Sequence, residues 1–384
     1  MKIALVHRKL DLNGGTERDL FRTAEGLRDL GHDVHLFCGE YGVSFPVGTS
    51  AHRVPVVPLG RTLRLWSFAL FAPWLLRNIP CDVMVNFGRL LSQDVLRSGG
   101  GSHRAFLHKL GQSGGLWRRL WQWASPYHQS LLAMEKWQFK PGHYQGILAV
   151  SDEVKRELAA TYAVPENQIM VIYNGVDHER FRPALRQEFR ESVRRQWHIP
   201  PEALTVLFVG NGFRRKGLDR LLAVWDSPEL KEVYLLVVGE DARRDRYAAW
   251  AERQAQARVV FTGRQTDVER YYGAADVVAL PAVQEAFGNV VLEALASGLP
   301  VVVSRTVGAA EVLKGSLVNG IVINPKNPRE IVTKLMSMLE RSRDPDLQME
   351  ARKLGEEYSW KNHFLKLQFF LQRVVEQRRC ESCF

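Results

Sequence analysis

Cysteine is scarce in this chain, with four residues in 384. Cys38 and Cys81 stand in apolar surroundings, which predicts buried thiols. Cys380 and Cys383 form a Cys-x-x-Cys pair. A metal site needs a second ligand pair at matching spacing, and the sequence offers none. The cysteines therefore predict no metal centre and no redox function.

Long hydrophobic runs are missing as well. The longest apolar run, residues 65–76, contains Pro73 and is shorter than the roughly 20 residues that cross a bilayer. Met1 and Lys2 lead into a short apolar strand rather than the extended region of a secretory signal. We expect a cytoplasmic protein without a membrane span, which could still bind the inner face of the cytoplasmic membrane as a peripheral protein.

Two ligand-binding patterns are also lacking. No Gly-x-Gly-x-x-Gly fingerprint follows a strand, which argues against a dehydrogenase. No Asp-x-Asp arrangement occupies a suitable loop, so the sequence does not predict a diphosphate held through a metal ion. We expect no cofactor and no metal.

Basic residues exceed acidic ones, giving a net charge of +10. Between residues 100 and 140 the excess is interleaved with tryptophans, and Glu135 is the one acid. Such a segment suits stacked nucleic-acid bases or an anionic membrane surface. No nucleic-acid module is recognisable. The residues concerned are Arg104, Lys109, Trp117, Arg118, Arg119, Trp121, Trp123, Lys136, Trp137 and Lys140.

Short apolar runs alternate with helical patterns along the whole chain, which predicts two doubly wound α/β domains with parallel sheets. Hydrophobic residues make up 46% of the composition, enough for two cores. The expected strands of the first half are 3–6, 34–37, 83–86 and 147–150. Those of the second half are 206–209, 233–238, 259–262, 277–280, 301–303 and 321–323. Asn174-Gly175 and the charged stretch 180–195 mark the expected boundary.

Residues 281–300 contain two glutamates, Glu285 and Glu293, separated by seven residues. Gly288 permits a tight turn between the strand 277–280 and the helix that carries Glu293. A helix N-terminus favours phosphate, and each carboxylate can accept two hydroxyl hydrogen bonds from a vicinal diol. The segment predicts a sugar-nucleotide site. The alternative is a helix-capping Glu285 and a solvated Glu293.

Three further stretches occur with this segment. They are Asn13-Gly14-Gly15-Thr16-Glu17-Arg18-Asp19, then Ala149-Val150-Ser151 with Asn174-Gly175-Val176-Asp177, and then Val209-Gly210-Asn211-Gly212-Phe213-Arg214-Arg215-Lys216-Gly217. In this order the four stretches resemble the signature of family 4 retaining glycosyltransferases. Within the family the likeness is to the glucosyltransferases that act on the heptose of the lipopolysaccharide core.

The resemblance implies a GT-B fold, in which two Rossmann-like doubly wound domains face a central cleft. It predicts an acceptor-side domain over residues 1–173 and a nucleotide-sugar domain over 174–357. The last segment, 358–384, should form a helix that packs back on the N-terminal domain.

The resemblance also assigns donor-binding roles. Arg215 and Lys216 would stabilise the departing diphosphate in place of a metal, and Arg214 is the better candidate for plain surface charge. Gly14 and Gly15 would let the backbone approach the donor, and Asp19 would orient that loop or complement the helix dipole. The remaining donor contacts are expected at Gly263, Arg264, Glu285, Ala286, Phe287, Gly288, Asn289 and Glu293.

His103, in a Gly-x-His-Arg element, is the acceptor-side candidate; it would bond the donor phosphate or assist proton movement, unless it is structural. Retention of anomeric configuration follows from the resemblance alone. With both glutamates used as ligands, we expect front-face substitution and assign no general base.

The sequence thus predicts a retaining, metal-independent hexosyltransferase. It would move a hexose, glucose by resemblance, from a nucleotide diphosphate sugar such as UDP-glucose to a lipid-linked saccharide such as lipopolysaccharide core heptose. A free glycan or small-molecule acceptor, a GT-B-shaped binding protein without turnover and a basic nucleic-acid-binding protein remain as alternatives.

Overall fold

The computed structural model describes residues 1–11, 15–112, 125–253 and 258–381. Contacts between Cα atoms divide the chain into two units. The first comprises residues 1–172 and 363–384, and the second comprises residues 173–362. Asn174-Gly175, one of the two predicted boundary markers, lies directly after the start of the second unit, and the charged stretch 180–195 lies inside that unit.

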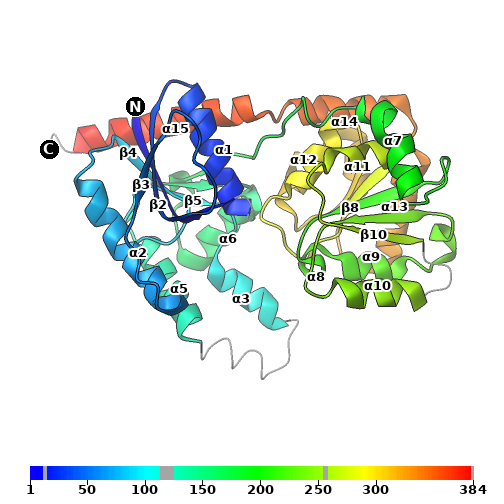
Figure 1. The fold of residues 1–384 in the computed structure, drawn as a ribbon, viewed down its shortest axis with the longest axis horizontal. Helices are drawn as coiled ribbons and strands as arrows, with labels where there is room; N and C mark the ends of the chain where they lie inside the picture. The colour runs from blue at the N-terminus through cyan, green and yellow to red at the C-terminus, as the bar shows by residue number, and fades with distance from the viewer. Residues whose placement is uncertain (12–14, 113–124, 254–257, 382–384) are drawn as a thin grey trace. The chain divides into compact units, whose positions relative to one another are not determined.

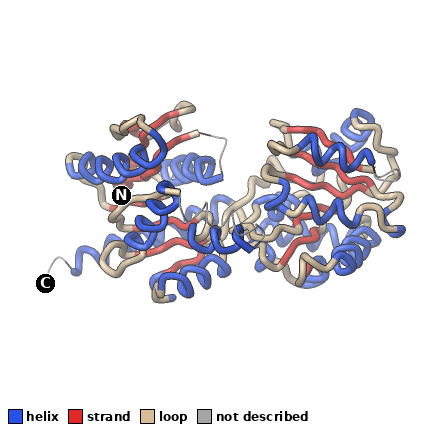
Figure 2. Tube along the Cα trace, turned by 90° about the horizontal axis from the view of Figure 1, so that it is seen from below, coloured by secondary structure: helices blue, strands red, loops and turns tan. Residues whose placement is uncertain are grey.

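The first unit is built on a parallel seven-stranded sheet in the order β3-β2-β1-β4-β5-β6-β7. Strands β2 to β5 of this sheet are labelled in Figure 1, and Figure 2 shows its strands in red with helices in blue beside them. Its central strands are short apolar runs with both faces buried, as parallel sheets require. The strands are β1 Lys2–Leu10, β2 Asp33–Tyr41, β3 Ser50–Arg53, β4 Val83–Asn86, β5 Val95–Ser98, β6 Gly146–Ala149 and β7 Ile169–Val171. The helices are α1 Gly15–Asp29, α2 Gly60–Arg77, α3 His103–Gln112, α5 Pro126–Gln138 and α6 Asp152–Tyr162.

The second unit holds a parallel six-stranded sheet in the order β10-β9-β8-β11-β12-β13. Both sheets confirm the predicted pair of doubly wound α/β domains. The strands are β8 Thr205–Val209, β9 Tyr234–Val238, β10 Val259–Gly263, β11 Val277–Leu280, β12 Val301–Ser304 and β13 Ile321–Val322. The helices are α7 Leu185–Gln196, α8 Phe213–Lys216, α9 Leu218–Val224, α10 Arg244–Arg253, α11 Glu269–Ala274, α12 Asn289–Ala296, α13 Pro328–Glu340 and α14 Pro345–Glu356.

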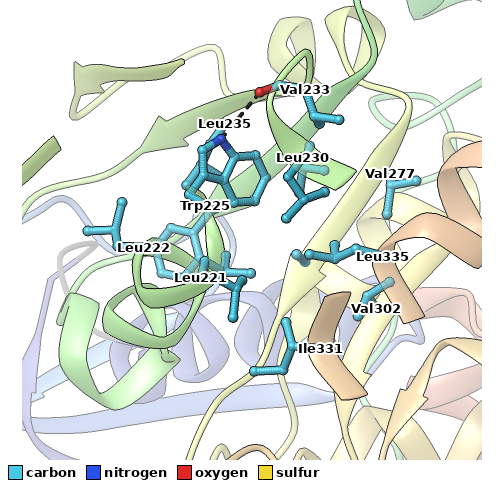
Figure 3. Packing of buried hydrophobic residues seen from close by; sticks show 14 of the residues in the cluster. Leu221, Leu222, Trp225, Leu230, Val233, Leu235, Val277, Val302, Ile331 and Leu335 are labelled. Atoms are coloured by element: carbon cyan, nitrogen blue, oxygen red, sulfur yellow. Dashed lines mark hydrogen bonds between the residues drawn. The ribbon is translucent and has the colours of Figure 1, made fainter. Parts of the chain in front are cut away.

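One face of this second sheet packs on α9 and α13 around Trp225 (Figure 3). Trp225 is 1% exposed, and its indole N–H donates to the Val233 carbonyl at 3.3 Å. Leu335 and Ile331 from α13 fill the other side of the cluster. The donor is satisfied and the rings are surrounded by aliphatic side chains, so this core fixes the sheet that carries the site described below.

The last helix, α15 Trp360–Glu381, begins in the second unit and belongs to the first from His363 onward. Phe364 covers Gly26 of α1 so closely that a methyl group there would lie 2.1 Å from the ring. Phe370 covers Gly146 of β6 in the same way, at 2.6 Å. These two glycines give the aromatic rings room to dock.

Two predictions about cysteine differ in outcome. Cys38 is buried, and burial raises the pKa of its thiol to about 12. Cys81 is only half-buried, so the prediction of a buried thiol was wrong for it, because it lies on the loop between α2 and β4 rather than in a strand. Cys380 is exposed near the end of α15, and Cys383 lies outside the described residues.

Among the described residues, no helix has the length and apolar content needed to cross a membrane. In the same part of the chain, no three His, Cys, Asp or Glu side chains gather as ligands for a metal ion.

Candidate functional site

Several loops meet at the carboxyl edge of the second sheet. The turn after β8 lies against the turn after β9. The approach is so close that a Cβ added at Gly239 would lie 2.2 Å from the Gly210 carbonyl oxygen. The Gly239 amide in turn donates to the Gly263 carbonyl at 2.9 Å. Open α/β sheets bind ligands at this edge. Gly263 is the last residue of β10, and Arg264 follows it. Both residues, predicted to hold the base, therefore lie beside this group of turns.

Two contacts hold the backbone of the basic loop 211–217 in place. Phe213 is fully buried, and its amide donates to Asp241 Oδ2 at 2.8 Å. Gly217 has φ +85°, and any side chain there would strike the Pro281 carbonyl. Buried Phe213 and the Gly217 contact fix the backbone of Arg215 and Lys216 beside the start of the 281–288 loop.

Three predicted site residues converge as a result. Arg215 forms an ion pair with Glu285 Oε2, and Lys216 Nζ lies 3.7 Å from the same oxygen. The Glu285 side chain is 17% exposed and that of Lys216 is 12% exposed, whereas Arg215 is 47% exposed. Two cations thus face one carboxylate in a partly desolvated setting, where charge-assisted hydrogen bonds are strongest.

Glu285 is held from its other side by a segment that the sequence did not single out. Its amide donates to the Thr306 carbonyl at 3.3 Å, and its carbonyl accepts from Gly308 at 3.0 Å. The Phe287 carbonyl accepts from Ala309 at 2.7 Å. Backbone bonds carry no side-chain signature, so no residue pattern could have revealed this support.

Helix α12 starts beside Glu285. Gly288 precedes it with φ +91° and provides no side-chain cap, so the first amides of α12 lie at a bare helix end. Asn289 is exposed there, and its Oδ1 accepts from Asn174 of the predicted interdomain segment at 2.8 Å. Phe287 is buried, whereas Ala286 is half-buried in the same turn.

Glu293 has a structural partner that the sequence did not predict. Its Oε2 accepts from the hydroxyl of Tyr272 on α11 at 2.5 Å. Burial, followed by the charge of Glu293, raises the pKa of Tyr272 well above its usual range, so the phenol stays protonated and donates. Tyr272 fixes one oxygen of Glu293, and the carboxylate keeps further acceptor capacity.

In the first unit, Gly15 begins α1 and is exposed, and a methyl group placed on it would meet nothing within 4 Å. Gly14 lies outside the described residues. Asp19, one turn further on, pairs at 2.5 Å with Arg97, whose side chain is 4% exposed. Burial raises the pKa of Asp19, and Arg97 opposes that shift. Arg97 interrupts the apolar pattern of β5, which concealed both the strand and this ion pair.

His103 lies at the first turn of α3 in a polar cluster. Its Nε2 is 3.0 Å from Nδ1 of His128, and its amide donates to Glu135 at 2.7 Å. Burial lowers the pKa of His103 to about 4. Near neutral pH the ring is therefore uncharged, which suits a hydrogen bond and excludes a permanent positive charge.

Glu135, the one acid of the basic segment 100–140, is completely buried beneath this helix. It pairs with Arg89 at 2.8 Å and accepts from Tyr162 at 2.5 Å as well as from the first amides of α3. Glu135 thus positions the start of α3. The remaining basic segment is described only in part: Trp117, Trp121, Trp123, Arg118 and Arg119 lie outside the described residues.

Two protein-family models match this chain, and together they cover most of its length. Residues 13–180 match the model "Glycosyltransferase Family 4", and residues 189–357 match the model "Glycosyl transferases group 1". The second match includes Arg215, Lys216, Glu285 and Glu293.

Individual relatives agree with the family models. The lipopolysaccharide glucosyltransferase WaaG of Escherichia coli is 26% identical over 86% of this chain and 87% of its own length. An uncharacterized glycosyltransferase of Methanocaldococcus jannaschii is 33% identical over 56% of this chain. That alignment spans only 57% of the archaeal protein.

Solved structures establish the GT-B fold. The crystal structure of WaaG superimposes with a TM-score of 0.78 at 24% identity, covering 96% of this chain and 99% of that one. Anabaena HepE in complex with UDP-glucose gives a TM-score of 0.68 at 17% identity, covering 97% and 100%.

Proposed function

Because the chain belongs to the glycosyltransferases described by the family 4 and group 1 models, we propose that it transfers a hexose from a nucleotide diphosphate sugar to a saccharide hydroxyl with retention of configuration. The observation that carries the proposal is the convergence of Arg215 and Lys216 on Glu285 at the carboxyl edge of the second sheet.

Arg215 and Lys216 supply what a departing diphosphate needs. Negative charge grows on the phosphate as the bond to the sugar breaks, and two fixed cations stabilise that charge without rearranging at the moment of reaction. The bare N-terminus of α12 adds its dipole on the same side of the loop. This set lets the transfer proceed without a metal.

Glu285 and Glu293 suit the two sugars of the donor. Glu285 is partly exposed between the cations and α12, where its carboxylate can accept hydroxyls of the transferred hexose. Glu293, oriented by Tyr272, would accept from the ribose. UDP-glucose is the proposed donor, supported by HepE, which was solved with UDP-glucose, and by the glucosyltransferase WaaG.

In the proposed reaction the acceptor oxygen attacks the anomeric carbon on the face from which the diphosphate departs. The breaking bond leaves its electron pair on the phosphate oxygen, which takes the acceptor proton. No general base is assigned. His103 acts as a neutral hydrogen-bonding group, in keeping with its lowered pKa.

The proposed acceptor is a lipid-linked saccharide such as lipopolysaccharide core heptose. It is supported by the relationship to WaaG over 86% of the chain and by the net charge of +10, which favours acidic glycolipids. A different glycan or small-molecule acceptor is the main alternative.

Binding of UDP, GDP, ADP and their hexose conjugates, measured by calorimetry with and without EDTA, tests the donor site. We expect UDP-glucose to bind in EDTA. Lys216→Gln should weaken UDP binding about 10- to 100-fold, because a charge-assisted hydrogen bond contributes about 1.5–3 kcal/mol.

Arg214→Gln is the matched control, since Arg214 is exposed directly before Arg215 and the sequence predicts plain surface charge for it. It should leave UDP affinity within about twofold. Equal losses in Lys216→Gln and Arg214→Gln would show that general basic charge, not this site, holds the nucleotide. Nucleic-acid binding without any nucleotide affinity would instead favour the nucleic-acid alternative.

A further inference from the structure

A pocket of about 310 Å³ lies within the second unit, and none of the described residues that line it is a predicted donor contact. Its walls come from the start of α7, from α11, from the turn after α12 and from α14. Helix α7 packs on α11 and α12 packs on α14, and Figure 1 shows the four helices in the second unit. The volume is within the range of small-molecule sites.

The lining of this pocket combines apolar surface with positive charge. Leu185 and Leu299 are buried in its wall, and Met349 is 52% exposed. Its charged groups are the guanidiniums of Arg186 and Arg352, and the described lining contains no Asp or Glu. Such a lining suits a small molecule that carries an oxyanion on an apolar body.

The positive charge at Arg186 is only partly neutralised. Arg186 shares the single carboxylate of Asp276 with Arg190 and Arg194, so three guanidiniums face one negative charge. Burial lowers the pKa of Arg190, and it lowers that of Arg194 to about 10, so both groups stay charged at neutral pH. An anion bound in the pocket would offset this excess of positive charge.

Both lining arginines keep a donor for such an anion. Arg186 uses Nη1 on a backbone carbonyl and Nη2 on Asp276, and its Nε donates to none of the described residues. Arg352 uses Nε on Glu356 and Nη1 on two backbone carbonyls, and its Nη2 donates to none of them. The guanidiniums are thus held by the protein while each has an N–H group left for a ligand.

Two other lining residues support Glu293. The Tyr272 hydroxyl donates to its carboxylate at 2.5 Å, and the Ser297 hydroxyl donates to its backbone carbonyl at 2.9 Å. The pocket therefore adjoins the support of the carboxylate to which we assign the donor ribose. A ligand packed against the ring of Tyr272 would restrain the phenol that orients Glu293.

We propose that this pocket is a second ligand site, which binds a small molecule with a carboxylate or phosphate group on an apolar body and thereby favours donor binding through Tyr272. Arg186 and Arg352 bind the oxyanion, and Leu299 and Met349 contact the apolar body. The link to the donor rests on the proposed function, whereas the site itself does not.

Calorimetry on the full chain saturated with UDP tests the site, because UDP then occupies the basic loop that could also bind an anion. The probes are phenyl phosphate and benzoate, with benzyl alcohol as the uncharged analogue. We expect at least one anionic probe to bind at least about tenfold more tightly than benzyl alcohol. The tighter of the two anionic probes identifies the preferred oxyanion.

Two variants remove different parts of the site. Arg186→Gln should weaken binding of the preferred probe at least about tenfold, and Asp276 keeps two arginines, so the fold is retained. Met349→Trp should weaken it as much by filling the pocket without changing its charge. The matched control is Arg195→Gln on the same helix, since Arg195 is 75% exposed and pairs with Glu191 outside the lining. It should stay within about twofold of the unaltered protein.

The link is tested by the affinity for UDP at a saturating concentration of the preferred probe. The probe should tighten UDP binding at least about fivefold. Tyr272→Phe keeps the ring and loses the hydrogen bond to Glu293, so it should abolish the gain. Competition at the basic loop would weaken UDP binding instead.

The proposal is overturned if neither anionic probe binds more tightly than benzyl alcohol, if Met349→Trp binds the probe unchanged, or if Arg186→Gln and Arg195→Gln lose affinity equally. Unchanged or weaker UDP binding in the presence of the probe overturns the link. If UDP itself does not bind, the proposed function fails together with the link. Probe binding to the UDP-free protein that Met349→Trp removes would still support the site.

Discussion

Asp276, in the second unit, is a carboxylate that pairs with three arginines. It is fully buried at the start of β11 and pairs with Arg186, Arg190 and Arg194 at 2.9–3.0 Å. The three arginines recur every four residues on one face of α7. Asp276 also accepts from the Thr205 amide at 3.0 Å, so it joins α7 to the central strands.

Asp276→Ala should therefore destabilise the second unit by about 3–5 kcal/mol, because it leaves buried guanidinium groups without their counter-charge. Denaturant unfolding measures the loss. Asp267→Ala is the control, since Asp267 is 39% exposed and pairs with Arg270 on the surface; it should cost at most about 1 kcal/mol. Equal losses of unfolding free energy in the two variants would mean that the three arginines find other partners when Asp276 is removed.

His103 gives a prediction about pH. Its pKa falls from 6.5 to about 4 on folding, so between these values the unfolded chain binds more protons than the folded one. The stability of the first unit should therefore decrease as pH falls from about 6.5 to 4. His7, His32 and His52 have lowered pKa values too and act in the same direction.

His103→Gln should reduce the difference in stability of the first unit between pH 7 and pH 5, measured by thermal unfolding at both values. The second unit provides the internal control, since its unfolding should respond to pH identically in both proteins. An unchanged pH dependence of the first unit would show that His103 is protonated without cost.

Among the elements, the strands found from sequence were those with uninterrupted apolar runs, such as β4 and β11, whose bounds match the prediction. Three strands were missed for physical reasons. Ser50–Arg53 is a half-exposed edge strand, Val95–Ser98 contains the buried Arg97, and Ile169–Val171 has only three residues. Pairing in a sheet made these segments strands, and local pattern could not show it.

The sequence also predicted the main residues of the candidate site but not the residues that support them. The sequence identified Arg215, Lys216 and Glu285, and the structure brings them together. Their supports were hidden: Asp241 holds the basic loop, and Tyr272 holds Glu293. Each support comes from an element whose own pattern is ordinary, so its role exists only in the folded arrangement.

Docking of α15 on α1 depends on the absence of a side chain at Gly26. Gly26→Ala should destabilise the first unit by about 1–3 kcal/mol, because the new methyl group overlaps the buried Phe364 ring. Thermal unfolding tests this. Gly15→Ala in the same helix is the control, since its methyl group meets nothing within 4 Å. A stable Gly26→Ala protein would show that the ring shifts freely.

The division into two units predicts how the protein unfolds. Calorimetry should resolve two transitions, and UDP should raise only the one that belongs to residues 173–362. Leu371 of α15 is fully buried. Leu371→Ala should therefore lower the free energy of unfolding of the first unit by about 2–5 kcal/mol. A single unfolding transition whose temperature responds both to UDP and to Leu371→Ala would contradict independent unfolding of the two units.

The return of α15 to the first unit also affects the order of events on the ribosome. Residues 1–172 emerge first, yet the helix that covers Gly26 and Gly146 is made about 190 residues later. At about 5–20 residues per second, that interval is about 10 to 40 s. During it the surfaces of the first unit at Gly26 and Gly146 lack the aromatic rings of α15 that cover them in the folded protein. The first unit therefore depends on protection by chaperones until α15 has been made.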